Sequence, residues 1–217
     1  MKSLVVIAVL AAPAYAYRPF DGTDADVAAE GDVELEIGPV IGERDSGTVH
    51  YTPGFVFNFG FAHGYELVID MDLLPDYFAS DVMIKKVLLD GSLQGRRGPS
   101  IALETGPLLP GTSDRQRDIG WAGNVIISQR WDALAIHLNG GVMYGRDRVI
   151  TPTANLIFEG PDTWLVRPVA ELAVEDRTTG LVGAIWRATD TLAIDAAIFA
   201  GRHDEGIRAG LTWVFPT

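Results

Sequence analysis

The stretch that decides the predicted fold is Ile207-Arg208-Ala209-Gly210-Leu211-Thr212-Trp213-Val214-Phe215, close to the end of the chain. Apolar residues occupy every second position from Ile207 to Phe215, and Arg208, Gly210 and Thr212 stand between them. A period of two is typical of a β-strand, because successive side chains point to opposite sides of the pleated backbone. The stretch therefore predicts a strand with one continuous apolar face that ends in two aromatic rings.

The same alternation recurs along most of the chain and predicts about twelve strands. Phe55, Phe57, Phe59 and Phe61 share one face of such a segment. The twelve expected ranges are 33–43, 50–62, 65–73, 80–90, 98–109, 119–130, 133–145, 150–160, 163–175, 180–188, 191–201 and 206–215. No later window holds eighteen uncharged apolar residues, so no membrane-spanning helix is expected. The pattern predicts an all-β fold, either an antiparallel up-and-down transmembrane β-barrel with its apolar face outward, or a soluble sandwich with that face inward.

The first sixteen residues have the pattern of a secretory signal peptide. Lys2 is followed by an apolar run over residues 4–12, and Ala14-Tyr15-Ala16 forms a small-x-small cleavage site. We expect residues 1–16 to be the signal peptide, 17–32 to be a polar extended segment, and 33–217 to form the barrel domain. The signal peptide therefore predicts that the chain is exported.

Composition excludes several classes of function. The chain of 217 residues has a net charge of −12 and no cysteine. An acidic chain lacks the clustered Lys and Arg that nucleic acid binding requires. The four histidines are scattered without the spacing of a ligand pair, and thiolate ligands are absent. The sequence predicts neither a metal site nor a cofactor.

The expected turns and aromatic residues agree with a barrel in an outer membrane. If the first strand starts on the periplasmic side, the turns that return there are generally short, and the opposite loops are longer and more charged. Aromatic residues gather at the same periplasmic ends, where amphipathic rings would lie at the level of the lipid headgroups. The predicted interface aromatics are Tyr65, Trp131, Trp164, Trp186, Trp213 and Phe215, with Trp121 and Tyr144 near the opposite rim.

In a membrane barrel, the polar faces of the strands would line the lumen. The candidate lumen-lining residues are Glu104, Asn124, Ser128, Arg130, His137, Asn139, Arg167, Glu171, Asp195 and Arg208. Charges in a confined lumen must pair or stay hydrated, because an isolated buried charge is costly. Two alternatives follow: a structural lattice of salt bridges, or a pore lining that sets selectivity.

A hydrolase is the third possibility for this face, because Ser128, His137 and Asn139 are the residue types of an outer-membrane phospholipase triad. A two-residue Trp131-Asp132 turn would pair Ala133 with Arg130 and place Ser128 opposite Ala135. Ser128 and His137 would then be diagonal neighbours, about 7–8 Å apart between backbones, which is too far for a nucleophile–base hydrogen bond. We therefore predict that the protein is not an enzyme.

The terminal strand resembles the closing strand that the assembly machinery of outer-membrane barrels reads. Four further places resemble a family of bacterial outer-membrane barrels known as MetA-pathway phenol-degradation proteins, which are transporter-like. They are Arg18-Pro19-Phe20 with Thr23-Asp24-Ala25 and residues 31–36; Pro99 to Glu104 with Leu109-Pro110; Ser128-Gln129-Arg130-Trp131 with His137-Leu138-Asn139; and Val169 to Leu172 with Asp195 and residues 210–215. The resemblance implies residence in the outer membrane, contact with lipid and lipopolysaccharide, and passage of a small solute.

The sequence as a whole predicts an outer-membrane β-barrel that acts as a channel or transporter for small solutes, aromatic or hydrophobic ones among them. A non-conducting structural barrel is the first alternative, and a soluble periplasmic lipocalin-like binder is the second. The binder would bury the four phenylalanines of residues 55–61, whereas the barrel would turn them outward.

Overall fold

A computed structural model describes residues 19–45, 48–74, 77–111, 118–145, 147–175, 177–202 and 205–217. The predicted signal peptide, residues 1–16, lies outside these ranges. Within the described part of the chain, no helix is long and apolar enough to cross a membrane.

Twelve strands account for most of the chain, which confirms the expected fold class. Each overlaps one of the ranges that the alternation predicts, with ends that differ by a few residues. The strands are β1 (Val33–Asp45), β2 (Thr48–Ala62), β3 (Tyr65–Leu74), β4 (Tyr77–Leu89), β5 (Ser100–Leu109), β6 (Gly120–Arg130), β7 (Ala135–Tyr144), β8 (Ile150–Glu159), β9 (Val166–Val174), β10 (Thr178–Arg187), β11 (Leu192–Gly201) and β12 (Glu205–Phe215).

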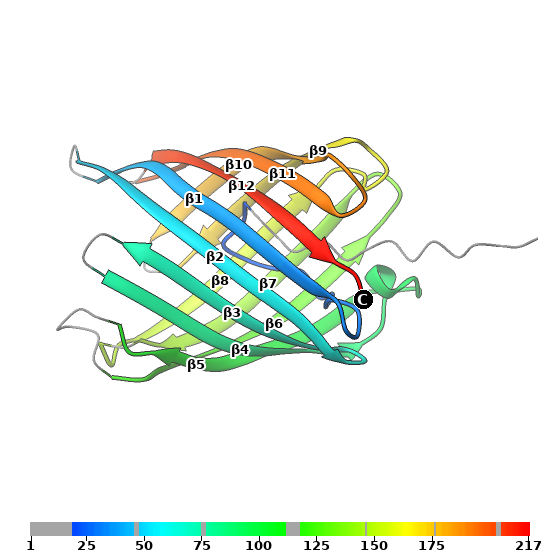
Figure 1. Cartoon of the computed structure of the whole chain (residues 1–217), viewed down its shortest axis with the longest axis horizontal. Coiled ribbons are helices and arrows are strands. Elements are labelled where there is room, and N and C mark those ends of the chain that lie inside the picture. Colours follow the sequence, from blue (N-terminus) through cyan, green and yellow to red (C-terminus); the bar gives the residue numbers. More distant parts are fainter. Residues whose placement is uncertain are drawn as a thin grey trace, which may run out of the picture.

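The strands form one closed barrel in which each strand pairs antiparallel with its neighbours in sequence (Figure 1). β1 closes the ring by pairing with both β2 and β12, so that Val33 is opposite Phe59 on one side and Phe215 on the other. Closure satisfies the backbone groups that an open sheet would leave at its edges. We call the end where β1 begins and β12 ends the terminal rim, and the other end the far rim.

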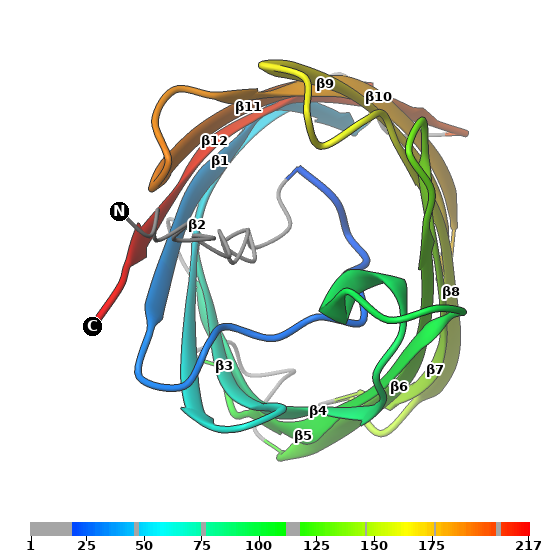
Figure 2. The same ribbon diagram turned by 90° about the vertical axis from the view of Figure 1, so that its right-hand side faces the viewer.

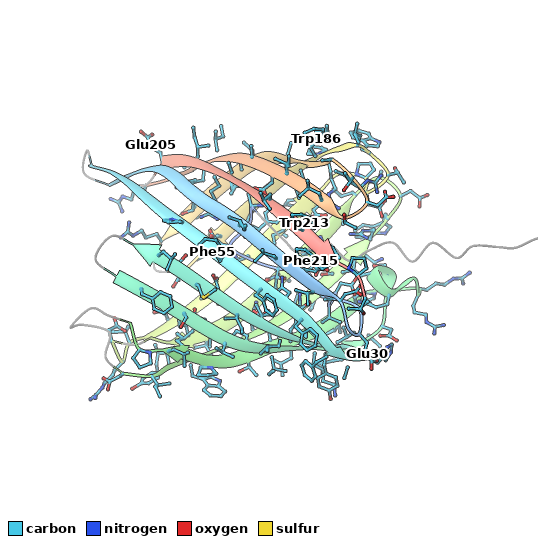
Figure 3. The ribbon with its side chains drawn as sticks, viewed as in Figure 1. Glu30, Phe55, Trp186, Glu205, Trp213 and Phe215 are labelled. Carbon is cyan, nitrogen blue, oxygen red and sulfur yellow. The ribbon has the colours of Figure 1, made fainter. Side chains whose placement is uncertain are left out.

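The outer face of the barrel is apolar. Phe61, Trp121, Leu138, Val182 and Ile198 are among the large hydrophobic side chains that are 40–60 % exposed. Figure 3 shows Trp186 pointing away from the barrel axis. Such a surface is costly in water and favourable in hydrocarbon.

The phenylalanine row of β2 belongs to this outer face. Phe55, Phe57 and Phe59 are half-buried and Phe61 is 43 % exposed, whereas the alternating residue Asn58 is buried. Because the structure consists of a single closed layer of strands, the row is not covered by a second sheet. This placement contradicts the soluble binder, which would bury the four rings.

We call residues 19–32 the strap: residues 19–28 lie inside the barrel, and Ala29 and Glu30 are exposed at the terminal rim. Figure 2 shows it in dark blue within the ring of strands before it turns into β1. Phe20, Ala25 and Ala28 of the strap are 9 %, 0 % and 2 % exposed. A segment expected only to be extended and polar is therefore part of the barrel interior.

The interior is partly apolar, whereas the sequence predicted a lumen lined by the polar faces of the strands. Phe20 belongs to a buried cluster with inward side chains of β8 to β11, namely Ile157, Val169, Leu181, Ile185, Ala193, Ala197 and Phe199. A second cluster joins Ala25 to Ala102 and Ile126, with Leu93 packed against it. The strap explains both clusters, because it supplies apolar partners that a water-filled lumen would lack.

The expected contrast between short and long connections is wrong. At the terminal rim, the connection 90–99 is as long as the connection 110–119 at the far rim, and the far-rim hairpins β1–β2 and β3–β4 have short connections. The connection 90–99 is long because its residues contact the strap inside the barrel. They contain the short helix η1 (Ser92–Gln94), and Gln94 Nε2 donates a hydrogen bond to Ala25 O at 3.0 Å.

Candidate functional site

The candidate site is the barrel lumen, where the strands bring most of the predicted polar residues together. Ser128, His137, Asn139, Glu171 and Asp195 are at most 5 % exposed. Glu104, Asn124, Arg130, Arg167 and Arg208 are half-buried. All ten lie at the alternating positions of their strands that face the axis, because the apolar residues between them face outward.

Two side chains hold the beginning of the strap by its backbone. The Glu171 carboxylate of β9 accepts hydrogen bonds from the N–H groups of Asp21 and Gly22, at 2.9 and 2.8 Å. Asn139 of β7 makes a two-way pair with Thr23: its Oδ1 accepts from Thr23 N–H and its Nδ2 donates to Thr23 O, both at 2.8 Å. Asn139 thus supplies the donor and acceptor that a neighbouring strand would offer.

Three further contacts hold the middle and the end of the strap. Ser128 Oγ of β6 accepts from Ala25 N–H at 2.8 Å, and Glu66 of β3 accepts from Ala28 N–H at 2.6 Å. Lys85 of β4 donates to Thr23 Oγ1 at 3.1 Å. The Lys85 ammonium also lies 3.5 Å from Asp24 and 3.9 Å from Glu66, so its buried charge is balanced by two carboxylates.

The arginines of the lumen pair with acidic residues. Arg208 Nη1 donates to Asp21 Oδ1 at 2.6 Å and to Pro19 O at 3.1 Å. Arg167 Nη1 lies 3.3 Å from the buried Glu159 carboxylate. Arg130 lies 3.5 Å from Asp162 at the terminal rim.

The predicted register around Ser128 is wrong. Ser128 stands directly opposite His137, and Arg130 pairs with Ala135. Residues 131–134 form a four-residue turn in place of the two-residue turn, closed by Trp131 N–H donating to Leu134 O at 2.8 Å. The change of register brings His137 Nδ1 to 2.8 Å from Ser128 Oγ, well within hydrogen-bonding distance.

This Ser–His pair is enclosed by protein. Ser128 and His137 are both 0 % exposed, and the Ser128 hydroxyl oxygen already accepts the Ala25 amide of the strap. Asn139, the third residue of the supposed triad, binds Thr23. A nucleophile needs an approach path for its substrate, and the strap occupies the space that such a path would cross.

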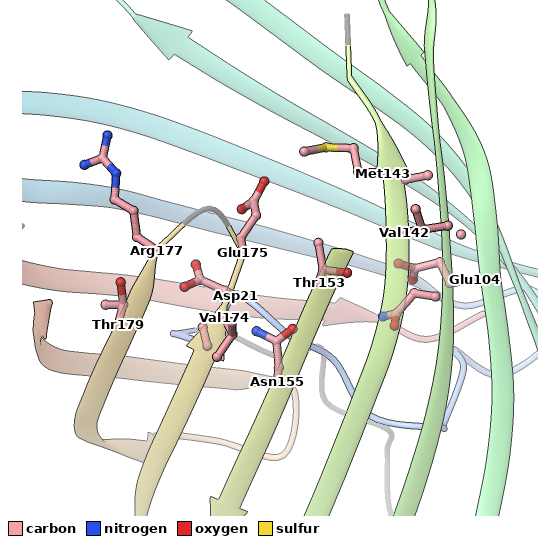
Figure 4. A pocket seen from close by; sticks show the side chains of 14 residues that line it. Asp21, Glu104, Val142, Met143, Thr153, Asn155, Val174, Glu175, Arg177 and Thr179 are labelled. Carbon is pink, nitrogen blue, oxygen red and sulfur yellow. The ribbon is translucent and has the colours of Figure 1, made fainter. Parts of the chain in front are cut away.

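A cavity of about 430 Å³ lies in the lumen on the far-rim side of the strap (Figure 4). Its lining combines polar residues such as Asn124, Thr153, Asn155 and Thr179 with apolar ones such as Val142 and Met143. The charged lining residues are Asp21 of the strap, Glu104, Glu175 and Arg177. No group of three potential ligands for a metal ion exists among the described residues.

Several site residues escaped the sequence pattern. Lys85 lies on β4 and is 4 % exposed on the inner face. Its neighbour Lys86 lies on the outside and places its ammonium 4.3 Å from the centre of the Tyr65 ring, with a hydrogen bond to the Tyr65 hydroxyl. The alternation pattern could not place Phe20 or Gln94, because neither residue belongs to a strand.

The aromatic residues lie at the two rims of the barrel. Tyr65, Trp131, Trp164, Trp186 and Trp213 are near the strand ends of the terminal rim, and the Trp213 and Phe215 rings stack with centroids 5.0 Å apart. Trp121 and Tyr144 are partners in register at the far rim. The exposed fractions of the five tryptophans are 46–56 %.

Two acidic residues outside the strands have shifted pKa values. Burial raises the pKa of Asp26 in the strap to about 6, and the neighbouring Asp24 carboxylate adds to the rise. The hydrogen bond from Gln94, the Val27 amide and the Lys85 charge oppose it. At the far rim, the hydrogen bond from Arg148 lowers the pKa of Asp118, and the two side chains lie 2.7 Å apart.

No protein-family model matches this sequence, and no curated protein matches it. Solved outer-membrane barrels share its fold. A KdgM porin in complex with disordered oligogalacturonate is 14 % identical, with a TM-score of 0.67 over 84 % of this chain and 99 % of that one. The outer membrane protein Omp33 of Acinetobacter baumannii is 9 % identical, with a TM-score of 0.59 over 86 % of this chain and 99 % of that one.

At these identities the likeness concerns the fold. The chain has the architecture of an outer-membrane porin, a closed antiparallel barrel of twelve strands. The apolar outer face and the polar groups of the inner face are features of this chain itself.

Proposed function

We propose that the protein is an outer-membrane channel for small solutes, with its route through the barrel lumen. The observation that carries this proposal is the far-rim cavity of about 430 Å³, lined by polar, charged and apolar residues, inside a barrel whose outer face is apolar. Twelve strands enclose more space than the eight whose side chains can fill a barrel. The likeness to KdgM and Omp33 supports the same function.

The outer face supports a location in the outer membrane, with lipid and lipopolysaccharide as its surroundings. In this location the terminal rim faces the periplasm, and its exposed tryptophans would lie among the lipid headgroups. The closing strand β12 carries the apolar alternation that would make it the signal for the assembly machinery. Its outward residues Ile207, Trp213 and Phe215 are 41–51 % exposed.

The solutes to test first are small and uncharged. The charged residues of the cavity lining are three carboxylates and one guanidinium, which disfavours a solute with several negative charges. For this reason we do not propose that this channel passes oligogalacturonate, the compound in the KdgM complex. The sequence resemblance to the phenol-degradation family adds small aromatic compounds, with phenol itself as the simplest probe.

We infer that the protein is not an enzyme. The buried Ser128–His137 pair supports the strap, since Ser128 Oγ accepts the Ala25 amide. The substitution Ser128→Ala should therefore leave any lipid hydrolysis by the purified protein at its background level. A wild-type phospholipase activity that disappears in Ser128→Ala would overturn this inference.

The channel itself is tested with purified protein in planar bilayers and in liposomes. We expect discrete conductance steps, and faster loss of phenol or a small neutral sugar from liposomes with protein than from protein-free liposomes. Silent bilayers together with tight liposomes would favour the non-conducting structural barrel instead.

A further inference from the structure

We propose that the strap is a seated plug. The inner wall of the barrel forms a binding site for an extended peptide, residues 19–32 of the same chain fill this site, and their occupancy closes the lumen between the far-rim cavity and the terminal rim. The effect on conductance rests on the proposed channel function, whereas the binding of the strap is a property of the barrel by itself.

The wall recognises the strap by its backbone. Five amides of the strap, those of Asp21, Gly22, Thr23, Ala25 and Ala28, donate to wall side chains at 2.6–2.9 Å. A segment that merely passed through a wet lumen would leave its amides to water. Side-chain acceptors that meet five amides of one eight-residue stretch, Asp21 to Ala28, are the features of a built peptide site.

Two apolar sockets fix the strap in register. Phe20 enters the cluster of β8 to β11, and Ala25 enters the cluster of Ala102 and Ile126. Both strap residues are almost fully buried. If the strap left, these clusters would face water inside the barrel, and the loss of burial opposes its departure.

The order of the contacts shows that the strap spans the lumen. From Pro19 to Ala28 its partners are Arg208 of β12, Glu171 of β9, Asn139 of β7, Ser128 of β6 and Glu66 of β3. These strands come in this order round the barrel, so the strap crosses from β12 to β7 and β6 on the opposite side of the ring and then reaches β3. Figure 2, which looks onto the terminal rim, shows the strap lying across the interior.

The exit of the strap is also fitted to the wall. Gly31 N–H donates to Gly60 O of β2 at 2.6 Å, and a Cβ atom on Gly60 would lie 2.1 Å from Ala29 O. Only glycine permits this close approach of two backbones. On the other side, Asp21 lines the far-rim cavity, so the beginning of the strap contributes to the wall of that cavity.

An engineered disulfide tests the proposal directly, because the chain has no cysteine of its own. A Cβ atom on Gly22 would lie 2.8 Å from the Cβ of Asn155 on β8. Disulfides need about 3.5–4.5 Å between these atoms, so a shift of about 1 Å admits the bond. The oxidised Gly22→Cys/Asn155→Cys double variant should conduct less than wild type, and a reducing agent should restore conductance in the same bilayer.

A complementary variant loosens the strap. Phe20→Ser removes the anchor from its socket, which should raise the equilibrium constant for unseating roughly 10- to 100-fold and increase the open fraction of the channel. Val27→Ser is the matched control, because Val27 lies on the strap outside both apolar clusters. A synthetic peptide with the sequence of residues 19–30, added to Phe20→Ser, should lower its conductance again.

Hydrogen exchange of the strap amides provides a readout that does not depend on conduction. We expect the Ala25 and Ala28 amides to exchange at least tenfold more slowly than in the free peptide, and Phe20→Ser to remove most of this protection. Unprotected amides in wild type would overturn the plug. So would a wild type that conducts together with a Gly22→Cys/Asn155→Cys double variant whose conductance is the same oxidised and reduced. Protected amides in a barrel that never conducts, even as Phe20→Ser, would overturn the channel and uphold the strap site.

Discussion

The outer and inner faces of the barrel wall are formed by the same strands, but they differ in which residues they accept. On the outer face, apolar residues such as Val182 and Ile198, which face each other across β10 and β11, are about half exposed. On the inner face, Ser128, Asn139 and Glu171 each bind a particular atom of the strap. The comparison shows that the outer face requires only that its residues be apolar. The inner face requires a particular residue at each position that binds the strap.

The largest expected effect comes from a charge on the outer face. Val182→Arg, near the middle of β10, should lower the free energy of unfolding by about 2–4 kcal/mol, because the guanidinium would lie in hydrocarbon. Ile150→Arg is the control at the far-rim end of β8, where the cost should be only about 0–1 kcal/mol. Urea unfolding in lipid vesicles measures both. Equal costs at the two positions would show that the outer face does not span a bilayer.

A polar deletion on the inner face should have the next largest effect. Ser128→Ala leaves the Ala25 amide and His137 Nδ1 without the hydroxyl that serves them, and should cost roughly 1–3 kcal/mol of unfolding free energy. The neighbouring outward residue Ile127 is 40 % exposed, and Ile127→Val should change the stability by less than about 0.5 kcal/mol. The comparison fails if the outward substitution costs as much as the inward one.

We expect binding of the strap to the inner face to depend on pH through the Asp26 carboxyl. The pKa of Asp26 is about 6 when the strap is seated, above its usual 3.8, because burial and Asp24 disfavour its charge. Seating is therefore strongest below pH 4 and weakens as the pH rises through 6. Between pH 5 and pH 7.5 the seating constant should fall by about tenfold.

Exchange of the Ala28 amide, corrected for the intrinsic effect of pH, measures this change. Asp26→Asn is the control, since its amide does not titrate and the part of the pH dependence that Asp26 contributes should vanish. Lys85, Asp24 and Gln94 are the polar groups that act on Asp26, and they remain in this variant. A wild-type strap that binds more tightly at pH 7.5 than at pH 5 would contradict the prediction that ionisation of Asp26 weakens its binding.

The smallest effect is expected at the far rim, outside both faces. Arg148 and Asp118 form an exposed ion pair, and exposed pairs contribute little because water and salt screen them. Arg148→Gln should leave the urea midpoint unchanged. A clear shift of that midpoint would mean that this loop contributes to the barrel, contrary to its exposure.

The sequence allowed the prediction of the wall because every strand repeats one signal. Twelve alternating segments, with apolar residues such as Leu211 and Trp213 at every second position, predict both the number of strands and the face that each residue occupies. This works because the orientation of a strand side chain depends on position alone. The inward placement of Glu104, Arg167 and Arg208 follows from the same rule.

The register of the central hairpin could not be obtained in this way. Residues 131–134 admit either a two-residue or a four-residue turn, and both keep the same faces inside and outside. The choice moves His137 from a diagonal position to one directly opposite Ser128. Packing against the strap favours the observed arrangement, because Ser128, His137 and Asn139 are then buried together beneath it.

The sequence by itself determined the wall: its strands, its closure by an apolar terminal strand, and the outward phenylalanines of β2. The tertiary structure alone decided what fills the interior, including the partners of Lys85, Gln94 and Glu171 and the buried position of Phe20. The physical reason is that a strand's faces follow from its own alternation, whereas the strap binds residues more than a hundred positions away, such as Glu171 and Arg208, which only the closed ring of strands brings within hydrogen-bonding distance.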